Sequence, residues 1–365
     1  MERNWCVACA VTDLSEHTIA TLAQELVADG FRPSHSGPLL RSYYRGDEVA
    51  GRNGRRFPPA LGVLLRGQAR RRAAAIAARR VAADGTTKLL IRLADTRTVE
   101  SVLMPGDRAD RAAGCVSSQV GCAMGCDFCA TAKAGFERDL SSGEIVEQFL
   151  ALRDEARAGG RRLQTMVFMG MGEPLLNLEN VCKAIERIAS NDMGGLGYRQ
   201  ITVSTVGIVP GIEALAASGL GVYLAVSLHA PDDPTRARLL PAGRRYGVRK
   251  ILAAADLYQS RVGRPVSIQY CLLAGVNDSI GQADHLATLL DGRRMHVNLL
   301  RYNPTGPGFR GETYTPSSNE ATKSFLDRLR RNGIVAHVRR SRGPDIDAAC
   351  GQLRQRAWTS MALPA

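Results

Sequence analysis

Three cysteines, Cys122, Cys126 and Cys129, lie within eight positions of one another in the segment GCAMGCDFCATAKAGF (121–136). Their spacing is CxxxCxxC, and no fourth cysteine continues it. Thiolates hold iron–sulfur clusters, and four of them would saturate a cubane. Three leave one iron open for a small molecule that carries an amine and a carboxylate. The rival interpretation is a zinc site, which would need a fourth protein ligand in tight spacing. Cys115 lies seven residues upstream, across a predicted strand.

The remaining cysteines do not suggest a disulfide scaffold. The chain has nine cysteines in 365 residues, an odd number that argues against a secreted, disulfide-stapled fold. Cys6 and Cys9 form a CxxC without a second pair nearby, and Cys182 and Cys271 lie in apolar stretches typical of small core residues. No apolar run reaches the roughly 18 residues of a membrane helix, and the N-terminal apolar patch is too short for a signal peptide. We therefore expect a cytoplasmic protein.

The elements that must position these cysteines follow a regular pattern from about residue 113 onward. Apolar, β-rich runs are predicted to form strands at 165–172, 200–207, 222–230, 266–275, 296–304 and 334–343. Amphipathic segments predict helices at 141–157, 178–190, 248–260, 283–291 and 318–331. Unbroken apolar strands that alternate with helices indicate a parallel sheet covered by helices. With the cysteine segment as a first strand, six or seven such units predict an α/β fold with a partial (β/α)6 barrel.

Each predicted strand runs into a polar or glycine-rich tip, such as GMGEPL, SLHAP or RYNPTGPG. In barrels of this kind, the C-terminal ends of the strands build the active site. We therefore expect the tip residues to converge with the three cysteines; they are Glu173, Ser204, Ser227, His229, Asn277 and Asn303. The alternative is that these residues only cap helices and form turns.

The chain is predicted to have three parts. Residues 1–95 would form a mainly helical N-terminal domain, 96–343 the barrel, and 344–365 a C-terminal tail. Within the first part, 12–31 has helical spacing after a cap at Thr12 or Ser15, and 69–80 is also helix-like. The segment 86–105 is predicted to form two strands around a turn near Asp95.

The charge of the chain is strongly positive. Lysine and arginine number 48 against 35 acidic residues, a net charge of +13. Residues 41–80 alone hold eleven arginines and two acids, including the run at 70–72. Guanidinium groups suit phosphate oxygens, so a nucleic acid is the natural partner, and a merely solvated surface is the alternative.

Longer segments of the chain resemble the radical S-adenosylmethionine (SAM) superfamily, in which CxxxCxxC at the end of a first barrel strand is followed by GEP. The likeness is closer still to the radical-SAM rRNA adenine methyltransferases, RlmN and its relative Cfr. It covers roughly 95–355 and is carried by the segments CVSSQVGCAMGCDFCATAKAGFERDLSSGEI, VFMGMGEPLLN, TVSTVGIVPGI, LAVSLHAPDD, LLAGVNDS and RRSRGPDIDAACGQL. The resemblance implies a partial barrel of the radical-SAM type and a small N-terminal domain that contacts RNA.

The resemblance also implies a role for each matching residue. Cys122, Cys126 and Cys129 match the three ligands of one [4Fe–4S] cluster. Cys350, in AACGQL, matches the cysteine that is methylated, Cys115 matches its disulfide-forming partner, and Glu100 matches the proton acceptor. The positions that match the SAM site are Gly172, Glu173, Ser204, Ser227, Leu228, His229 and Asn303.

Two cysteines make chemical sense for this reaction. An adenine ring carbon such as C2 is electrophilic and cannot attack the methyl group of SAM as an ordinary nucleophile would. The resemblance implies that Cys350 first takes a methyl group from one SAM, and that a second SAM yields a radical that removes a hydrogen from it. The methylene carbon then adds to the ring, a base takes the ring proton, and Cys115 releases the product by attack on the sulfur of Cys350.

The implied substrate is a loop adenine of 23S rRNA, of the position-2503 type, with tRNA adenine 37 as a further one. A flavodoxin- or ferredoxin-type electron donor and a monomeric state are implied as well. GMGEPL and AGFERDL, with Phe136, favour C2 methylation as in RlmN. The alternatives are C8 methylation as in Cfr with antibiotic resistance, a paralogue without catalysis, or an enzyme for another RNA, a peptide or a small molecule.

Overall fold

The computed structural model describes residues 13–46, 57–58, 61 and 75–353. Its main sheet has the strand order β1-β2-β3-β4-β7-β8-β9-β10-β11-β12. The strands from β4 onward pair in parallel with their neighbours. Their bounds are β4 Arg111–Cys115, β7 Arg162–Phe168, β8 Ile201–Thr205, β9 Tyr223–Ser227, β10 Val266–Leu272, β11 Met295–Arg301 and β12 Ala336–Arg339.

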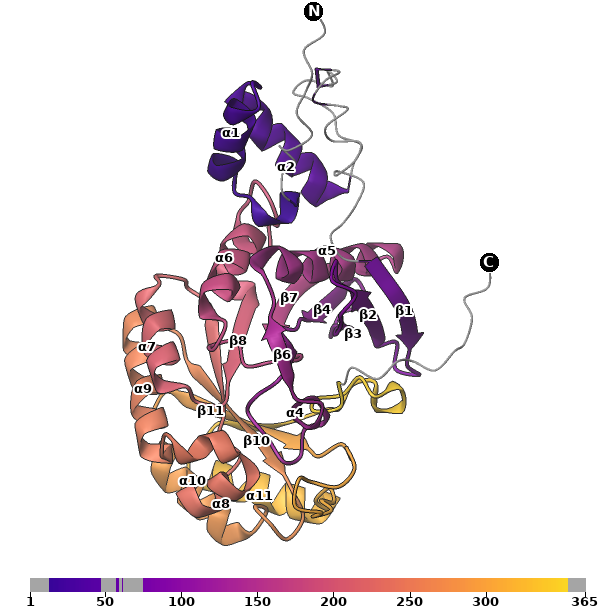
Figure 1. Cartoon of the computed structure of the whole chain (residues 1–365). Helices are drawn as coiled ribbons and strands as arrows, with labels where there is room; N and C mark the ends of the chain where they lie inside the picture. The colour runs from indigo at the N-terminus through magenta and orange to yellow at the C-terminus, as the bar shows by residue number, and fades with distance from the viewer. Residues whose placement is uncertain (1–12, 47–56, 59–60, 62–74, 354–365) are drawn as a thin grey trace, which may run out of the picture.

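A helix joins each of these parallel strands to the next. The helices are α5 Ser142–Ala158, α6 Leu178–Ala189, α7 Val209–Ala217, α9 Val248–Val262, α10 Ile280–Leu290 and α11 Asn319–Arg331. Figure 1 shows them along the outer side of a curved sheet. Since β1 and β12 stand at opposite ends of this sheet, the described barrel is open. Six strand–helix steps and a closing strand confirm the predicted partial barrel of the α/β class.

The local sequence explains why these elements form. All seven residues of β10, VSIQYCL, are buried, as expected for a strand covered on both faces. Helix α5 begins at a capping box in which the hydroxyl of Ser141 accepts from the backbone of Glu144 and the carboxylate of Glu144 accepts from the backbone of Ser141. The strands end two to four residues before the apolar runs do. Most residues of the polar tips therefore lie in the loops that follow the strands, while Ser204 and Ser227 still belong to β8 and β9.

An antiparallel extension flanks β4. It consists of β1 Ala75–Val81, β2 Thr87–Arg92 and β3 Thr98–Pro105, and β3 pairs with β4. The two strands predicted at 86–105 are thus confirmed, and the expected domain boundary at 95 lies in the turn that joins them. The helix predicted at 69–80 is wrong for 75–80, while 69–74 lie outside the described residues. Alanine and arginine favour a helix locally, but pairing with β2 at the edge of the sheet overrides that preference.

The described N-terminal segment is helical, with η1 Leu14–Glu16, α1 Ile19–Ala28, η2 Pro33–His35 and α2 Ser36–Arg45. Figure 1 shows α1 and α2 above α5 and α6. The cap of α1 is Thr18, which forms a capping box with Thr21, so the cap predicted at Ser15 is wrong; Thr12 lies outside the described residues. Ser15 is buried in η1, where its carbonyl accepts from Arg187 of α6 at 3.1 Å.

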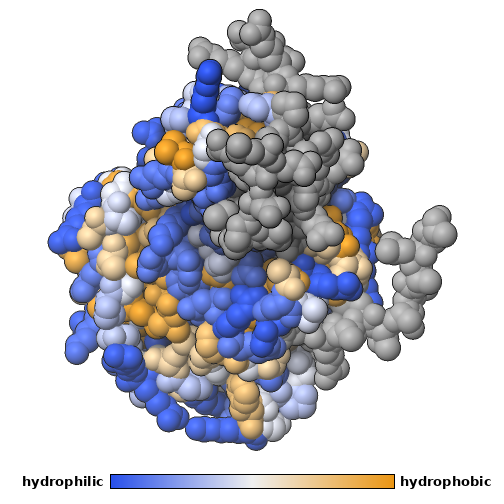
Figure 2. Space-filling view, turned by 45° about the horizontal axis from the view of Figure 1, so that its top comes forward, coloured by the Kyte–Doolittle hydropathy of each residue, from blue (hydrophilic) through white to orange (hydrophobic). Residues whose placement is uncertain are grey.

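Shorter elements complete the barrel. They are β5 Gln119–Gly121, β6 Phe136–Asp139, α4 Ala130–Lys133, η4 Tyr198–Gln200, α8 Asp233–Leu239, η5 Pro241–Arg244 and η6 Pro344–Ile346. None of the described helices combines the length and the apolar character that a membrane crossing requires. On the face drawn in Figure 2, hydrophilic residues predominate and hydrophobic ones form scattered patches.

Candidate active site

The three clustered cysteines occupy the loop between β5 and α4. Gly121 begins it with φ +79°, and a Cβ there would lie 2.0 Å from the carbonyl oxygen of Gly135, so only glycine fits. The amide of Cys122 donates to that same carbonyl at 2.7 Å, and the amide of Asp127 donates to the carbonyl of Leu239 in α8 at 3.0 Å. The loop is therefore held from two sides by neighbouring backbone.

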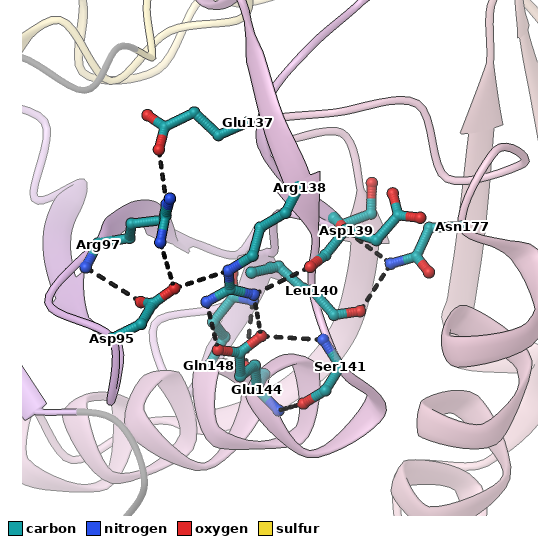
Figure 3. Close-up of polar contacts among 11 residues, drawn as sticks. Asp95, Arg97, Glu137, Arg138, Asp139, Leu140, Ser141, Glu144, Gln148 and Asn177 are labelled. Carbon is teal, nitrogen blue, oxygen red and sulfur yellow. Dashed lines mark hydrogen bonds and ion pairs between the residues drawn. The ribbon is translucent and has the colours of Figure 1, made fainter.

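Polar contacts fix the hairpin that follows this loop. Arg138 of β6 lies at their centre in Figure 3, with both Nη atoms 2.8 Å from the carboxylate of Glu144 and Nε 2.8 Å from Asp95. The side-chain nitrogen Nδ2 of Asn177 donates to the backbone carbonyls of Ser118 and Leu140, each at 2.8 Å. These bonds tie the β5–β6 hairpin, which carries the cysteine loop, to the turn between β2 and β3, to the first turn of α5 and to the start of α6.

The three thiols lie close enough to influence one another. Burial raises the pKa of Cys122 to about 12, and the negative charges of Cys129 and Glu173 add to the shift. Burial also raises the pKa of Cys126, again with contributions from Cys129 and Cys122. Within the described residues, no three histidine, cysteine or acidic side chains converge on one ion. Thiolate sulfur is the donor that iron–sulfur clusters take, so the chemistry of the three thiols fits a [4Fe–4S] cluster.

Glu173 lies where β7 and β8 end, next to the cysteine loop. Its Oε1 accepts from the amide of Leu175 at 3.1 Å and its Oε2 from the amide of Val206 at 2.8 Å. Burial raises the pKa of Glu173 to about 7. The preceding Gly172 has φ +98°, and a Cβ there would lie 2.5 Å from Cβ of Gln119. Glycine is therefore required for the backbone to pass β5 and to bring the carboxyl group into this position.

The ends of β8 and β9 supply the next predicted residues. Ser204 of β8 and Ser227 of β9 are half-buried, and the residues next to them in each strand are buried. Leu228 and His229 follow β9, and their amides both donate to the carbonyl of Gln269, at 3.1 and 3.4 Å. His229 has φ +61°, an uncommon conformation for a residue with a side chain.

His229 is held as a neutral imidazole. Its Nδ1 accepts from the amide of Cys271 at 2.9 Å, which places the ring proton on Nε2. Burial lowers the pKa of His229 to about 3, and the charge of Arg236 lowers it further. The ring also packs edge-on against Phe128 of the cysteine loop, with 5.0 Å between centroids. This histidine can therefore donate a hydrogen bond from Nε2 but does not carry a proton as a general acid at neutral pH.

Asn277 lies among these strand ends as a structural brace. Its amide nitrogen donates to the carbonyls of His229 and Cys271, both at 2.7 Å, and its oxygen accepts from the amide of Leu273 at 2.7 Å. The alternative that a tip residue only shapes a turn thus describes Asn277 well.

The C-terminal tail returns to the cysteine loop. The amide of Ala130 donates to the carbonyl of Gly351 at 2.7 Å, and Asn303 donates through Nδ2 to the carbonyl of Cys350 at 3.4 Å. Ala130 directly follows Cys129, so the tail places Cys350 beside the third cysteine of the loop. Cys350 is exposed to solvent, yet surrounding protein raises the pKa of its thiol. The thiol is thus accessible to solvent beside the cysteine loop.

Cys115 lies near Cys350, although the two are far apart in the sequence. It ends β4, is buried, and carries a free thiol. Burial raises the pKa of Cys115 to about 12, and the negative charge of Cys350 is the next contribution. The positive charge of Arg339, at the end of β12, lowers the pKa of both thiols. The structure thus brings together two cysteines that the sequence places in different parts.

Glu100 shares a sheet face with Cys115. Val102 pairs with Cys115 across β3 and β4, and residues two apart in a strand point to the same side. The carboxylate of Glu100 is buried and lies 3.1 Å from Nζ of Lys88 on β2. Nζ of Lys88 also donates to the carbonyl of Asp347, at 3.1 Å, three residues before Cys350. The predicted proton acceptor is therefore connected to the tail through one buried lysine.

Sequence reasoning missed three polar side chains of this region: Lys88, Gln119 and Arg236. Gln119 accepts from the amide of Glu173 at 2.8 Å. Lys88 and Arg236 are buried charges. A signal existed for Lys88, because it is one of five lysines in the chain and interrupts an apolar strand. Arg236 gave none, since arginine is abundant throughout the sequence.

Comparison with known proteins identifies the family of this chain. The model of the radical SAM superfamily matches residues 116–287. The chain is 64% identical over 341 residues to "Probable dual-specificity RNA methyltransferase RlmN 1" of Opitutus terrae, covering 93% of this chain and 96% of the relative. It is 47% identical over 273 residues to "Probable dual-specificity RNA methyltransferase RlmN" of Thermotoga neapolitana, covering 74% of this chain and 76% of the relative.

A solved structure gives the same result. The crystal structure of a radical SAM methyltransferase from Sphaerobacter thermophilus matches with a TM-score of 0.88 at 40% identity, covering 94% of this chain and 99% of that one. Membership of the superfamily implies a [4Fe–4S] cluster and SAM. Identity of this extent across nearly the whole chain leads to one conclusion: this protein is an enzyme of the RlmN family of radical SAM RNA methyltransferases.

Proposed function

We propose that this enzyme methylates C2 of the adenine at position 2503 of 23S rRNA, and adenine 37 of tRNA as a second substrate, through a methylated cysteine. The observation that supports this most strongly is the proximity of Cys115 and Cys350 beside the cysteine loop. A methyltransferase that used simple displacement from SAM would have no use for two neighbouring thiols. The names of the relatives support an RNA substrate with dual specificity.

The cofactors have a natural place in this site. Cys122, Cys126 and Cys129 would hold one [4Fe–4S] cluster. Residues of the strand ends would hold SAM, two molecules per turnover: Gly172, Glu173, Ser204, Ser227, Leu228, His229 and Asn303. When bound, the cluster and SAM together supply one-electron chemistry that can remove hydrogen from an unreactive methyl group. The carboxylate of Glu173 can accept from an ammonium group, and Nε2 of neutral His229 can donate to an acceptor.

The protein's own residues carry the remaining steps. The sulfur of Cys350 is accessible and can accept a methyl group, and Arg339 favours its thiolate form. Glu100 takes the proton from the ring carbon. The thiolate of Cys115 then attacks the sulfur of Cys350, so that an S–S bond forms and the bond from that sulfur to the methylene carbon breaks. The electron pair of the broken bond stays on the carbon, which takes a proton and becomes the methyl group of the product, and the unpaired electron of the adduct leaves to a one-electron acceptor. An external reductant restores the two thiols before the next turnover.

The RNA-binding part of the proposal rests on charge and accessibility. The net charge of +13 favours phosphate binding, and the arginine-rich segment 41–80, much of it outside the described residues, would hold phosphates without reading sequence. A loop adenine can leave its stack and enter the mouth of the barrel. The same proposal places the enzyme in the cytoplasm as a monomer, with a flavodoxin- or ferredoxin-type protein as electron donor.

Single substitutions at the two cysteines test the mechanism, because they act at different steps. Cys350→Ala should give neither methylated RNA nor an RNA adduct, since the methyl group has no acceptor. Cys115→Ala should form the methylene link and fail to release it, so that RNA remains attached to the peptide that contains Cys350. The adduct should survive denaturant and disappear with nuclease, as measured by gel shift and mass spectrometry.

Cys271→Ala is the matched control. Cys271 is buried and its pKa is raised by burial and by Cys350, so it lies near the same thiol, but the mechanism gives it no role. The Cys271→Ala variant should methylate RNA normally and should accumulate no covalent RNA adduct. Normal turnover of Cys115→Ala without trapped RNA would refute the two-cysteine mechanism. Mass spectrometry of the nucleoside product separates the alternatives, because 8-methyladenosine in place of 2-methyladenosine would indicate a Cfr-like enzyme.

A further inference from the structure

A buried guanidinium group lies behind the cysteine loop. Arg236, on α8, has only 1% of its surface exposed. Its Nη2 donates to the carbonyl of Val206, but Nε and Nη1 have no hydrogen-bonding partner among the residues that the structure describes. Charged groups this deeply buried are nearly always paired, because loss of hydration costs several kcal/mol per ion. Arg236 therefore calls for an anion that the described part of the chain does not supply.

The surroundings of Arg236 point to the cysteine loop. Leu239 and Leu240, which follow it along the chain, pack in one apolar cluster with Cys122 and Cys126, and Val206 packs against that cluster. The amide of Asp127 donates to the carbonyl of Leu239 at 3.0 Å. Helix α8 thus lies directly against the loop. Among neighbouring charges, Cys126 acts most strongly on Arg236, and Arg236 in turn lowers the pKa of Cys126.

Asp233, a carboxylate whose charge acts on Arg236, does not fill this role. Asp233 lies one turn earlier on the same helix, but its Oδ1 accepts from the amide of Val248 at 2.7 Å and so serves the start of α9. Its effect on Arg236 is smaller than that of Cys126. His229 also lies within reach of the charge of Arg236, and it is neutral. The protein groups around Arg236 therefore leave its charge largely uncompensated.

We infer that Arg236 is the buried counter-ion of the iron–sulfur cluster and favours its reduced form. This inference rests on the proposed binding of that cluster by Cys122, Cys126 and Cys129. Three thiolates outweigh the positive charge of the resting core, and reduction adds a further negative charge. A fixed positive charge in a poorly hydrated place stabilises the reduced state more than the oxidised state. Net charge and hydrogen bonds to the sulfurs are known levers on cluster potentials.

The test is a potentiometric titration of the full chain, reconstituted anaerobically with iron and sulfide and followed by EPR without SAM. In Arg236→Met the ratio of reduced to oxidised cluster at a given potential should fall at least about tenfold, which is about 59 mV for one electron. Arg236→Lys keeps the charge and should lie between the two. Arg238→Met is the control, since Arg238 is on the same helix but 49% exposed and pairs with Glu312 at 3.2 Å. Its removal should leave the potential unchanged.

Iron content distinguishes the possible failures. A wild-type chain that holds no four-iron cluster would refute the proposed cofactor site itself. An Arg236→Met variant with a full cluster and an unchanged potential would overturn the present inference alone, even if its affinity for SAM fell, because the anion would then belong to SAM.

If Arg236→Met does not retain the cluster, Arg236→Lys and the cluster-free protein carry the test. Without the cluster, Arg236→Met should melt at a higher temperature than wild type, because the substitution removes an uncompensated buried charge. A lower melting temperature of cluster-free Arg236→Met would show that Arg236 is satisfied within the protein and would refute the inference. A cluster potential of Arg236→Lys that lies about 59 mV or more below that of wild type, the drop expected for a neutral side chain, would refute it as well.

Discussion

Replacing Lys88 tests whether the buried ion pair beside the paired cysteines holds this part of the fold together. Nζ of Lys88 lies 3.1 Å from Oε1 of Glu100, and the two side chains are 3% and 1% exposed. Nζ also donates to the carbonyl of Asp347 at 3.1 Å. Lys88→Met removes the charge and the hydrogen-bond donor but keeps most of the volume. The carboxylate of Glu100 is then left buried without its cation.

The size of the effect follows from this burial. Removing one partner of a buried pair costs roughly 3–5 kcal/mol, because the other charge stays out of water. The lost hydrogen bond to Asp347 contributes about 1 kcal/mol. We expect Lys88→Met to lower the free energy of unfolding by about 5 kcal/mol. Adding Glu100→Gln removes the stranded charge, so the double variant should lose only about 2 kcal/mol despite carrying one more substitution.

Urea unfolding of the cluster-free protein, followed by circular dichroism, measures these differences independently of catalysis. Arg79→Met is the matched control. Arg79 on β1 lies closer to its partner, with Nη2 2.6 Å from Glu155, but the side chains are 50% and 15% exposed. Arg79→Met should lower the free energy of unfolding by at most about 1 kcal/mol. Equal losses for Lys88→Met and Arg79→Met, or a double variant less stable than Lys88→Met, would refute the argument from burial.

Three further predictions concern the pH, SAM and salt dependence of this enzyme. Burial raises the pKa of Glu173 from 4.5 to about 7, so its contribution to stability is full below pH 4.5 and is lost as the pH rises through 7. Glu173→Gln should abolish that fall of about 3 kcal/mol in urea titrations of the cluster-free protein, and an unchanged profile would contradict it. Gly172→Ala, whose Cβ would meet Gln119 at 2.5 Å, should weaken SAM binding at least about tenfold in equilibrium dialysis; unaltered binding would show that the loop can shift. Replacing the arginines at 70–72, which lie outside the described residues, by alanine should reduce the slope of log K for RNA against log salt by about 2 to 3, and an equal slope would mean that they do not touch phosphate.

The sequence by itself determined the class of fold and the chemical character of the site. Unbroken apolar runs such as VSIQYCL can only be buried on both faces, and their alternation with amphipathic segments requires a parallel sheet covered by helices. Most residues of the polar tips lie after the strands because β7 to β12 end before the apolar runs do. Local patterns suffice here, since the periodicity of burial and the caps of helices depend on residues only a few positions apart.

Local patterns failed where a distant partner decided the outcome. The segment 75–80 favours a helix by composition, but it forms β1 because its backbone pairs with β2. Helix α1 begins after Thr18 rather than Ser15, because Ser15 is buried in η1, where its carbonyl accepts from Arg187. In both cases a contact made by the folded chain outweighed a preference of a few tenths of a kcal/mol per residue.

Only the tertiary structure decided which reactive groups meet. Cys115 ends β4 and Cys350 lies in a tail that follows the last strand, yet the hydrogen bond from Ala130 to Gly351 returns that tail to the cysteine loop. Lys88 connects Glu100 to Asp347 across the antiparallel extension, and Arg236 becomes buried because α8 packs on the loop. No local period encodes these meetings, because they arise from the order of strands in the sheet and from the closure of long loops.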